Sequence, residues 1–167
     1  RPDAVAARGA ALRRHAAFAL ALLAMQIALG GWVSSNYAVM ACPDFPLCHG
    51  EWMPGRMDFY HAFTLWRPLG MTGGGELIPF DSLVAIHWVH RSFAYLVFLM
   101  LGALAWRAWR VGGLGRWSRV LALLLGVQFF TGLSNVLLAW PLPLAVLHNG
   151  GAALLVMALV MVNFRLK

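Results

Sequence analysis

Residues 82–106, SLVAIHWVHRSFAYLVFLMLGALAW, form an apolar run that is long enough to cross a bilayer as a helix. A membrane-spanning helix needs roughly 20 such residues. Three polar groups interrupt the run near its start: the imidazoles of His87 and His90 and the guanidinium of Arg91. Ionisable groups at membrane depth are costly, and they usually face a partner inside a bundle. The run therefore predicts a membrane helix whose polar side chains have a function.

The whole chain has the composition of a membrane protein. Of its 167 residues, 61% are hydrophobic and 11% are charged, against about 45–50% and 25% in soluble domains. Four runs could span a bilayer, at about 16–37, 82–106, 119–140 and 143–164. A cleavable signal peptide is a weaker interpretation of the first, because no small-residue cleavage site follows it. We expect an all-α integral membrane protein, a four-transmembrane-helix bundle with a long external loop, 41–81, between helices 1 and 2.

Basic residues are distributed unevenly along the chain. Most lie before the first run, in the 107–119 loop or at the end: Arg1, Arg8, Arg13, Arg14, Arg107, Arg110, Arg116, Arg119, Arg165 and Lys167. By the positive-inside rule these segments are cytoplasmic, so the 41–81 loop is outside a bacterial inner (cell) membrane. The net charge of +7 then reflects orientation in the lipid. We expect no nucleic-acid partner, because no separate basic patch is present.

The expected domain organisation is simple. Residues 1–14 are rich in Ala and Arg and are interpreted as a cytoplasmic tail or linker, and residues 15–167 as one four-helix membrane domain. The chain begins with Arg, so we expect a processed product or a piece of a longer protein.

Histidines occur at matched depths in two of the runs. His87, His90 and Arg91 lie about 10–13 Å from the outer end of the second run, at 1.5 Å per residue. His148 lies roughly 8 Å into the fourth run on the same basis. Both helices enter from the outside, so the histidines share one half of the bilayer. Two neutral imidazoles on facing helices can bind one heme iron inside a four-helix bundle.

Each of these residues has a plainer interpretation. A single histidine in a membrane helix is more often a hydrogen-bonded packing residue, and only the matched pair favours ligation. His90 is the better ligand candidate, although His87 lies three residues earlier and shares its helix face. Arg91 is a possible partner for a heme propionate, or its long side chain reaches the interface. His15, His49 and His61 are expected to be solvated.

Other residues suggest a pocket and an internal repeat. Small residues at 149–153 would let a flat macrocycle approach the backbone, and three aromatic side chains could wall such a pocket: Phe93, Phe129 and Phe130. The first and third runs both contain Gln-x-x-x-Gly, at 26–30 and 128–132. This indicates two helical hairpins, each with one histidine-bearing helix. Chance, or close packing at the glycines, explains the spacing equally well.

Cys42 and Cys48 are the only cysteines. Their even number, common side, short separation and two intervening prolines favour a disulfide in an oxidising compartment. Zinc binding with His49 and Asp44 is the minor alternative. A possible thiol–disulfide partner is compatible with the same spacing, so a structural and an exchanging bridge both stay open.

Four stretches occur in order along the chain: GGWVSSNYAVMACPDFPLCHG at 30–50, IHWVHRSFAYLV at 86–97, QFFTGLSNVLLAWPL at 128–142 and LHNGGAALLV at 147–156. Together they resemble the heme A synthase family of cytochrome oxidase assembly. The resemblance covers roughly residues 22–160.

The resemblance implies two fused four-helix units, each with histidines on its second and fourth helices. One unit holds the heme O to be oxidised, and the other holds a permanent heme b. This chain resembles the C-terminal unit, so its partners would be the N-terminal substrate-binding half of the same enzyme and heme O or heme A. His90 and His148 would then be axial ligands of the heme b iron. Cys42 and Cys48 would form the family's disulfide.

One position departs from the family's substrate-binding motif. That motif has an acidic residue three positions before the helix-two histidine, and this chain has His87 there. We therefore expect the heme b-binding half of heme A synthase, an oxidoreductase that oxidises the C8 methyl of heme O to a formyl group. This half would relay electrons through a bis-His heme and would not be catalytic alone.

Two other functions fit the same residues. One is a bis-His b-type membrane cytochrome in quinol-linked electron transfer. A cytochrome with two hemes would need four depth-matched histidines, and the first and third runs have none. The other is a heme-free membrane assembly factor whose histidines only pack.

Overall fold

The computed structural model describes residues 2–111 and 113–166, which are helical over most of their length. The helices are α1 (Pro2–Ser35), the short 3-10 helix η1 (Ala38–Met40), α2 (Phe59–Ala62), α3 (Phe80–Trp109), α4 (Gly115–Leu137) and α5 (Leu142–Arg165). The four long ones are apolar enough to cross a membrane. The predicted all-α fold with four transmembrane helices is thus confirmed. A helix satisfies its own backbone hydrogen bonds, as lipid requires.

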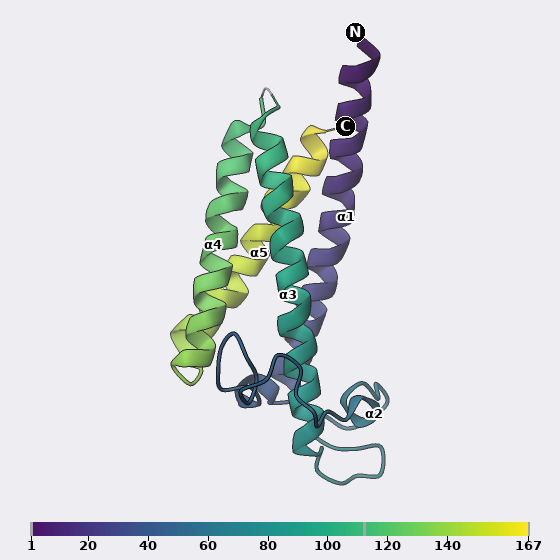
Figure 1. Ribbon diagram of the computed structural model, residues 1–167, viewed down its shortest axis with the longest axis vertical. Helices are drawn as coiled ribbons and strands as arrows, with labels where there is room; N and C mark the ends of the chain where they lie inside the picture. Colours follow the sequence, from purple (N-terminus) through teal and green to yellow (C-terminus); the bar gives the residue numbers. More distant parts are fainter. Residues whose placement is uncertain (1, 112, 167) are drawn as a thin grey trace.

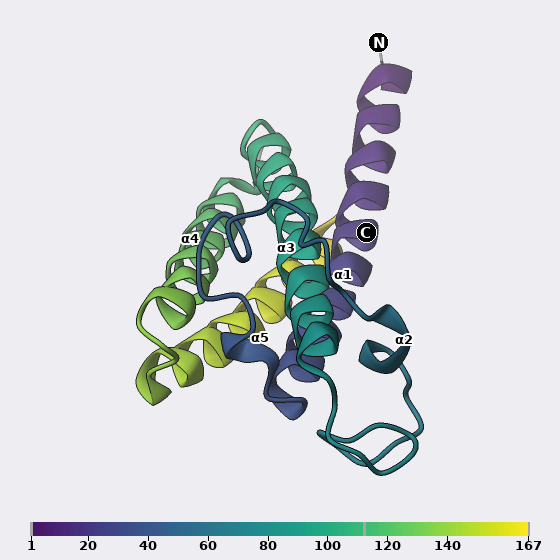
Figure 2. The same ribbon diagram turned by 60° about the horizontal axis from the view of Figure 1, so that its bottom comes forward.

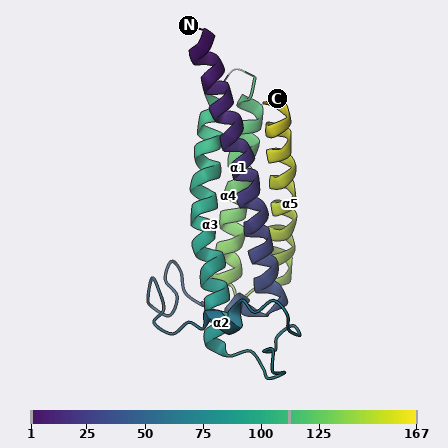
Figure 3. The same ribbon diagram turned by 90° about the vertical axis from the view of Figure 1, so that its right-hand side faces the viewer.

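The long helices form an antiparallel bundle (Figure 1). The two ends of the chain lie at one end of the bundle, the termini end, and residues 36–79 lie at the other, the capped end (Figure 3). Each long helix packs against two neighbours in the order α1, α3, α4, α5. Hence α1 and α4 form one diagonal pair, and α3 and α5 form the other.

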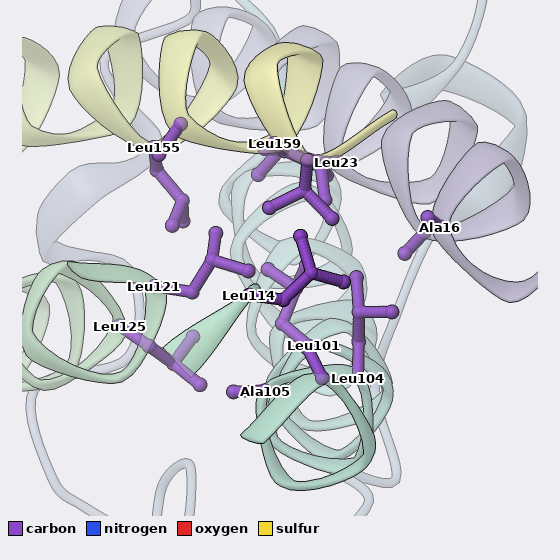
Figure 4. Packing of buried hydrophobic residues seen from close by; sticks show 14 of the residues in the cluster. Ala16, Leu23, Leu101, Leu104, Ala105, Leu114, Leu121, Leu125, Leu155 and Leu159 are labelled. Atoms are coloured by element: carbon purple, nitrogen blue, oxygen red, sulfur yellow. The ribbon is translucent and has the colours of Figure 1, made fainter. Parts of the chain in front are cut away.

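Leucine and alanine fill the bundle toward its termini end. Side chains from all four long helices meet there in one cluster, which Figure 4 shows: Ala16, Leu23, Leu101, Leu104, Ala105, Leu121, Leu125, Leu155 and Leu159. The alanines let neighbouring backbones approach closely. A buried hydroxyl also joins α4 to α3, because Ser118 Oγ donates to the Ala105 carbonyl at 2.6 Å.

Two helix ends differ from the sequence expectation. The apolar run 119–140 extends three residues beyond α4, which ends at Leu137. Ala139 and Trp140 have positive φ angles of 54° and 60°, so this apolar stretch turns into α5. At the other end of the chain, α1 continues through residues 2–14, the predicted tail.

His15, predicted to be solvated, is partly buried and hydrogen-bonded to a neighbouring helix. It lies on α1, where its Nδ1 is 3.1 Å from Arg107 Nη1 and its Nε2 is 3.0 Å from the Met100 carbonyl. A guanidinium only donates, so Nδ1 accepts and Nε2–H donates to Met100. His15 therefore joins α1 to α3.

Residues 36–79 fold at the capped end, against the last turns of α1 and the first turns of α3 (Figure 2). Asp58 accepts hydrogen bonds from the backbone N–H of His61 and from Ser82 Oγ, so it caps α2 and ties it to α3. The His61 side chain also pairs with Asp58. Hydrogen bonding from His61 holds the pKa of Asp58 below its ordinary value of 3.8. Trp32 Nε1 donates to the Ala62 carbonyl at 2.9 Å and links α2 to α1.

Candidate functional site

A cavity of about 990 Å³ lies between the four long helices on the side of the capped end. Toward the termini end the cavity is closed by four residues of the leucine cluster: Leu23, Val97, Leu125 and Leu155. Its wall includes His87, His90, Arg91, Gln26, Gly30, Tyr95, Phe98, Gln128, Phe129, Gly132, Asn135, His148, Asn149, Ala152 and, from the cap, Phe45. The four residues proposed from the sequence for the heme site thus face one space: His87, His90 and Arg91 on α3, and His148 on α5.

His90 is held against α1. A Cβ added at Gly30 would lie 3.0 Å from His90 Cε1, closer than almost all real Cβ contacts, so the ring would have to shift. Gln26 Nε2 donates to the His90 carbonyl at 3.2 Å and lies 3.2 Å from His90 Nδ1. One turn of α1 therefore fixes both the backbone and the imidazole of His90.

His148 is held against α4 in the same way. A Cβ added at Gly132 would lie 3.2 Å from His148 Cε1. Gln128 Nε2 donates to the His148 carbonyl at 3.1 Å. Thr131 Oγ1 lies 2.9 Å from His148 Nδ1, whereas the group beside His90 Nδ1 is Gln26 Nε2. The Gln-x-x-x-Gly spacing thus has the same consequence in both hairpins: the glutamine holds the carbonyl and the glycine receives the ring.

Arg91 anchors the disulfide loop to α3. Cys42 and Cys48 form a disulfide. Arg91 Nη1 donates to the carbonyls of Asp44 and Leu47 at 2.8 and 2.6 Å, and Nη2 donates to that of Cys42 at 3.0 Å. The buried guanidinium thus supplies hydrogen-bond donors to three loop carbonyls.

His87 accepts a hydrogen bond from the same guanidinium. Arg91 Nη2 lies 3.3 Å from His87 Nε2, and an arginine can only donate. His87 Nε2 is therefore an acceptor and Nδ1 carries the proton. Nδ1 is buried and has no hydrogen-bond partner. His87 and His90 share a cavity, but only His90 keeps its ring clear of Arg91.

The disulfide loop also covers the cavity. The Phe45 ring centroid lies 6.5 Å from that of Tyr95 on α3 and 6.3 Å from that of Phe129 on α4. The Arg91 guanidinium carbon lies 5.9 Å from the Phe45 centroid. The loop thus places an aromatic ring across the gap between α3 and α4.

The aromatic walls were only partly predictable. Phe129 lines the cavity as expected. Phe130 is 66% exposed, and Phe93 packs against the leucine cluster. Phe45 and Phe98 line the cavity in their place, and no sequence signal identifies them because a helix register and a loop path decide it.

The alternative of a zinc site at the cysteines is not supported. The two sulfurs are bonded to each other. The Asp44 carboxylate accepts from the backbone N–H groups of Gly50 and His49, both at 2.8 Å. These donors, Gly50 first, hold the pKa of Asp44 below its ordinary value. His49 Nε2 lies 2.8 Å from the Ala41 carbonyl, so each candidate ligand already has a partner within the loop.

The residues in the cavity fit a heme. Two imidazoles on the diagonal helices α3 and α5 face the space from opposite sides. Pockets for small molecules and cofactors measure about 300–1,000 Å³ and are mostly apolar. This cavity is at the upper end of that range, and small residues on α5, Ala152 and Ala153, line one wall.

Several known proteins are similar in sequence to this chain. Residues 2–160 match the model of the COX15-CtaA family, described as cytochrome oxidase assembly protein. The chain is 37% identical to the heme A synthase of Shewanella oneidensis over 167 residues, 98% of this chain and 50% of that protein. It is 33% identical to the heme A synthase of Rhodospirillum centenum over 147 residues, 86% of this chain and 36% of that protein.

The chain spans about half the length, or less, of the curated relatives it matches. No solved structure matches it. Because the family model covers almost the whole chain, this protein belongs to the COX15-CtaA family of cytochrome oxidase assembly proteins.

Proposed function

We propose that this chain is the heme b-binding half of a heme A synthase, with His90 and His148 as the axial ligands of the iron. One observation carries the proposal: imidazoles from two diagonal helices face a single cavity of about 990 Å³, each seated on a glycine of a neighbouring helix. A packing histidine needs neither a cavity nor a second imidazole opposite it.

The ligand assignment follows from the hydrogen-bond partners of the ring nitrogens. Thr131 Oγ1 donates to the Val127 carbonyl at 2.7 Å, so it accepts from His148 Nδ1–H. His148 Nε2 is then the unprotonated nitrogen that a metal ion requires. His90 is favoured over His87, since His87 Nε2 already accepts from Arg91. Arg91 also lines the cavity, so its charge is the proposed attraction for a propionate.

A heme with two histidine ligands supplies one-electron transfer without an open coordination position. The residues of this chain bind and orient the macrocycle and keep water away from it. Gly30 and Gly132 set the two ring positions, and Phe45 covers the gap between α3 and α4. The protein part of the mechanism is therefore ligation, low polarity and restricted access.

The proposal for the whole enzyme rests on the relatives. Two of the relatives are named heme A synthase, and such an enzyme would oxidise the C8 methyl of heme O to a formyl group. In α3 the acidic residue is Asp81, in the first turn, and His87 stands where the resemblance implies a catalytic acid. We therefore assign the oxidation to a second, substrate-binding unit and the electron relay to this one.

A purified sample tests the ligation. The protein should show the absorption spectrum of a low-spin heme b, and both His90→Ala and His148→Ala should lose it. His61→Ala is the matched control, because His61 pairs with Asp58 in the cap and should leave the spectrum unchanged. A folded, colourless wild-type protein would reject heme binding and favour the heme-free assembly factor.

Heme A content separates the synthase from a quinol-linked cytochrome. Cells that lack this protein should contain heme O and little heme A when the extracted hemes are resolved by chromatography. Wild-type protein should restore heme A, and His90→Ala should not. Normal heme A in the deletion strain would reject the synthase and leave the cytochrome.

A further inference from the structure

The two proposed ligands have different partners at Nδ1. A histidine that binds iron through Nε2 carries its proton on Nδ1, and it almost always donates that proton to a nearby acceptor. The acceptor fixes the tautomer and the ring orientation, and it makes the imidazole a stronger electron donor. His148 and His90 must therefore each have such an acceptor if both bind iron.

Thr131 is the acceptor for His148. It lies on α4, three residues after Gln128, and it is buried. Its single hydroxyl proton goes to the Val127 carbonyl at 2.7 Å. Only its lone pair remains for His148 Nδ1, 2.9 Å away. The tautomer of His148 is thus determined by the backbone of α4 through one hydroxyl.

The residue at the equivalent position on α1 cannot accept a hydrogen bond from His90. Three residues after Gln26 stands Leu29, which has no polar atom. The polar group beside the His90 ring is the Gln26 carboxamide, whose Nε2 lies 3.2 Å from Nδ1 and 3.5 Å from Nε2 of the imidazole. Its other terminal atom, Oε1, is buried without a hydrogen-bond partner. A buried acceptor without a donor is destabilising, so an unpaired oxygen beside the imidazole requires an explanation.

The carboxamide can face the ring in two ways. With Nε2 toward the ring, the amide donates to Nδ1, which places the imidazole proton on Nε2 and excludes that nitrogen from a metal. With Oε1 toward the ring, the oxygen accepts from Nδ1–H, and Nε2 is free to bind. A half-turn of the amide exchanges the two, at the expense of the hydrogen bond to the His90 carbonyl.

We propose that Gln26 is the positioning residue of His90: its carboxamide turns so that Oε1 accepts from His90 Nδ1–H when Nε2 binds iron, whereas Thr131 holds His148 in that tautomer permanently. This inference rests on the proposed heme ligation by His90 and His148. The repeated hairpins thus contain one adjustable ligand and one fixed ligand, and Gln128, which has the position of Gln26, holds only the His148 carbonyl.

The test compares matched variants of the heme-loaded protein by redox titration, electron paramagnetic resonance and the rate of heme transfer to apomyoglobin. Gln26→Leu removes the acceptor at His90, and Gln128→Leu removes only the carbonyl contact in the other hairpin. Thr131→Val removes the acceptor at His148, and Thr131→Ser restores it. Gln26→Glu keeps an acceptor at Nδ1 but no donor.

Loss of an acceptor weakens electron donation to ferric iron and raises the midpoint potential. Gln26→Leu and Thr131→Val should each raise it and speed heme loss by roughly 10–100-fold, the usual effect of removing a group that supports a metal ligand. Gln128→Leu should shift the potential less than Gln26→Leu. Thr131→Ser should return it toward wild type, and Gln26→Glu should lower it.

Equal shifts in Gln26→Leu and Gln128→Leu would overturn the inference, since a general packing effect would then explain both. A raised potential in Gln26→Glu would also overturn it, and this variant covers the case in which Gln26→Leu does not fold. A wild-type protein without a low-spin heme spectrum would reject the proposed function itself. A normal wild-type spectrum with unshifted variants would reject only the inference.

Discussion

At the scale of single residues, the site depends on two glycines, because neither has a side chain. Gly30 and Gly132 lie where a methyl group would meet the Cε1 atoms of His90 and His148, at 3.0 and 3.2 Å. Few real Cβ contacts are so short, and an imidazole has no flexible end that could move aside. Gly151 plays a related part, because a Cβ there would clash with Gln128 Nε2.

Gly132→Ala should weaken heme binding about tenfold, in the range found when groups that support a metal ligand are changed. The added methyl displaces the His148 ring from the cavity. Gly126→Ala on the same helix is the control, because its Cβ would have no neighbour within 4 Å. Heme titration of both purified variants measures the difference. Equal affinities would show that the ring has room to move.

Asp58→Asn should lower the melting temperature at neutral pH. Asparagine can still cap α2, but it lacks the negative charge of the carboxylate that pairs with the His61 side chain. The pKa of Asp58 is lowered by folding. Its contribution is thus present above the ordinary value of 3.8 and is lost as the pH falls through the lower folded value. Over the interval from pH 7 to pH 3, the melting temperatures of wild type and variant should therefore approach each other once the pH falls below 3.8. Parallel curves over that interval would contradict the assignment.

At the scale of elements, the bundle consists of two hairpins, α1 with α3 and α4 with α5. In each, the first helix supplies a glutamine and a glycine and the second supplies the histidine that they hold. The long segment between α1 and α3 adds the cover. Its disulfide loop is attached to α3 by Arg91 through three carbonyls.

Arg91→Lys should release this loop without opening the disulfide. A lysine presents one compact ammonium and cannot reproduce the fork that reaches three carbonyls. Amide hydrogen exchange at residues 42–48 should accelerate at least about tenfold, since one charged hydrogen bond contributes about 1.5–3 kcal/mol. Arg107→Lys, at the termini end, is the control and should leave this loop protected. An unchanged exchange rate in Arg91→Lys would show that the disulfide alone holds the loop.

At the scale of the whole molecule, the bundle is divided between a packed half and a hollow half. The leucine cluster fills the termini end, and the cavity occupies the side of the capped end. The capped end carries five of the six acidic residues, and most basic residues lie at the other end. We propose that the capped end faces the outside, with both termini in the cytoplasm.

Cysteine labelling in intact cells tests this orientation. Trp66→Cys lies at the capped end, where the native side chain is 96% exposed, and should react with a membrane-impermeant maleimide. Arg116→Cys, in the first turn of α4, should react only after the cells are opened. The native cysteines are bonded to each other and do not interfere. The reverse pattern would invert the topology.

Much of the fold was predictable because apolar length is a local property. The four predicted runs correspond to α1, α3, α4 and α5. The boundary errors lie at 138–140, where apolar residues form a turn, and at residues 2–14, where α1 continues. The cysteine pairing was also predictable, since two cysteines six residues apart allow one bridge. The cavity lining was less so: Phe129 was expected, whereas Phe45 depends on the path of a loop.

By itself the sequence determined the four spans, the two histidine-bearing helices and the disulfide, because hydrophobic length, residue type and short separation suffice for them. Tertiary structure alone decided that α3 and α5 are diagonal, that His87 is engaged by Arg91, and that Thr131 but not Leu29 supports an imidazole. These facts depend on which helix faces meet across the bundle. Which faces meet is decided by packing between segments far apart in the chain, such as those of Gln26 and His90, which are 64 positions apart.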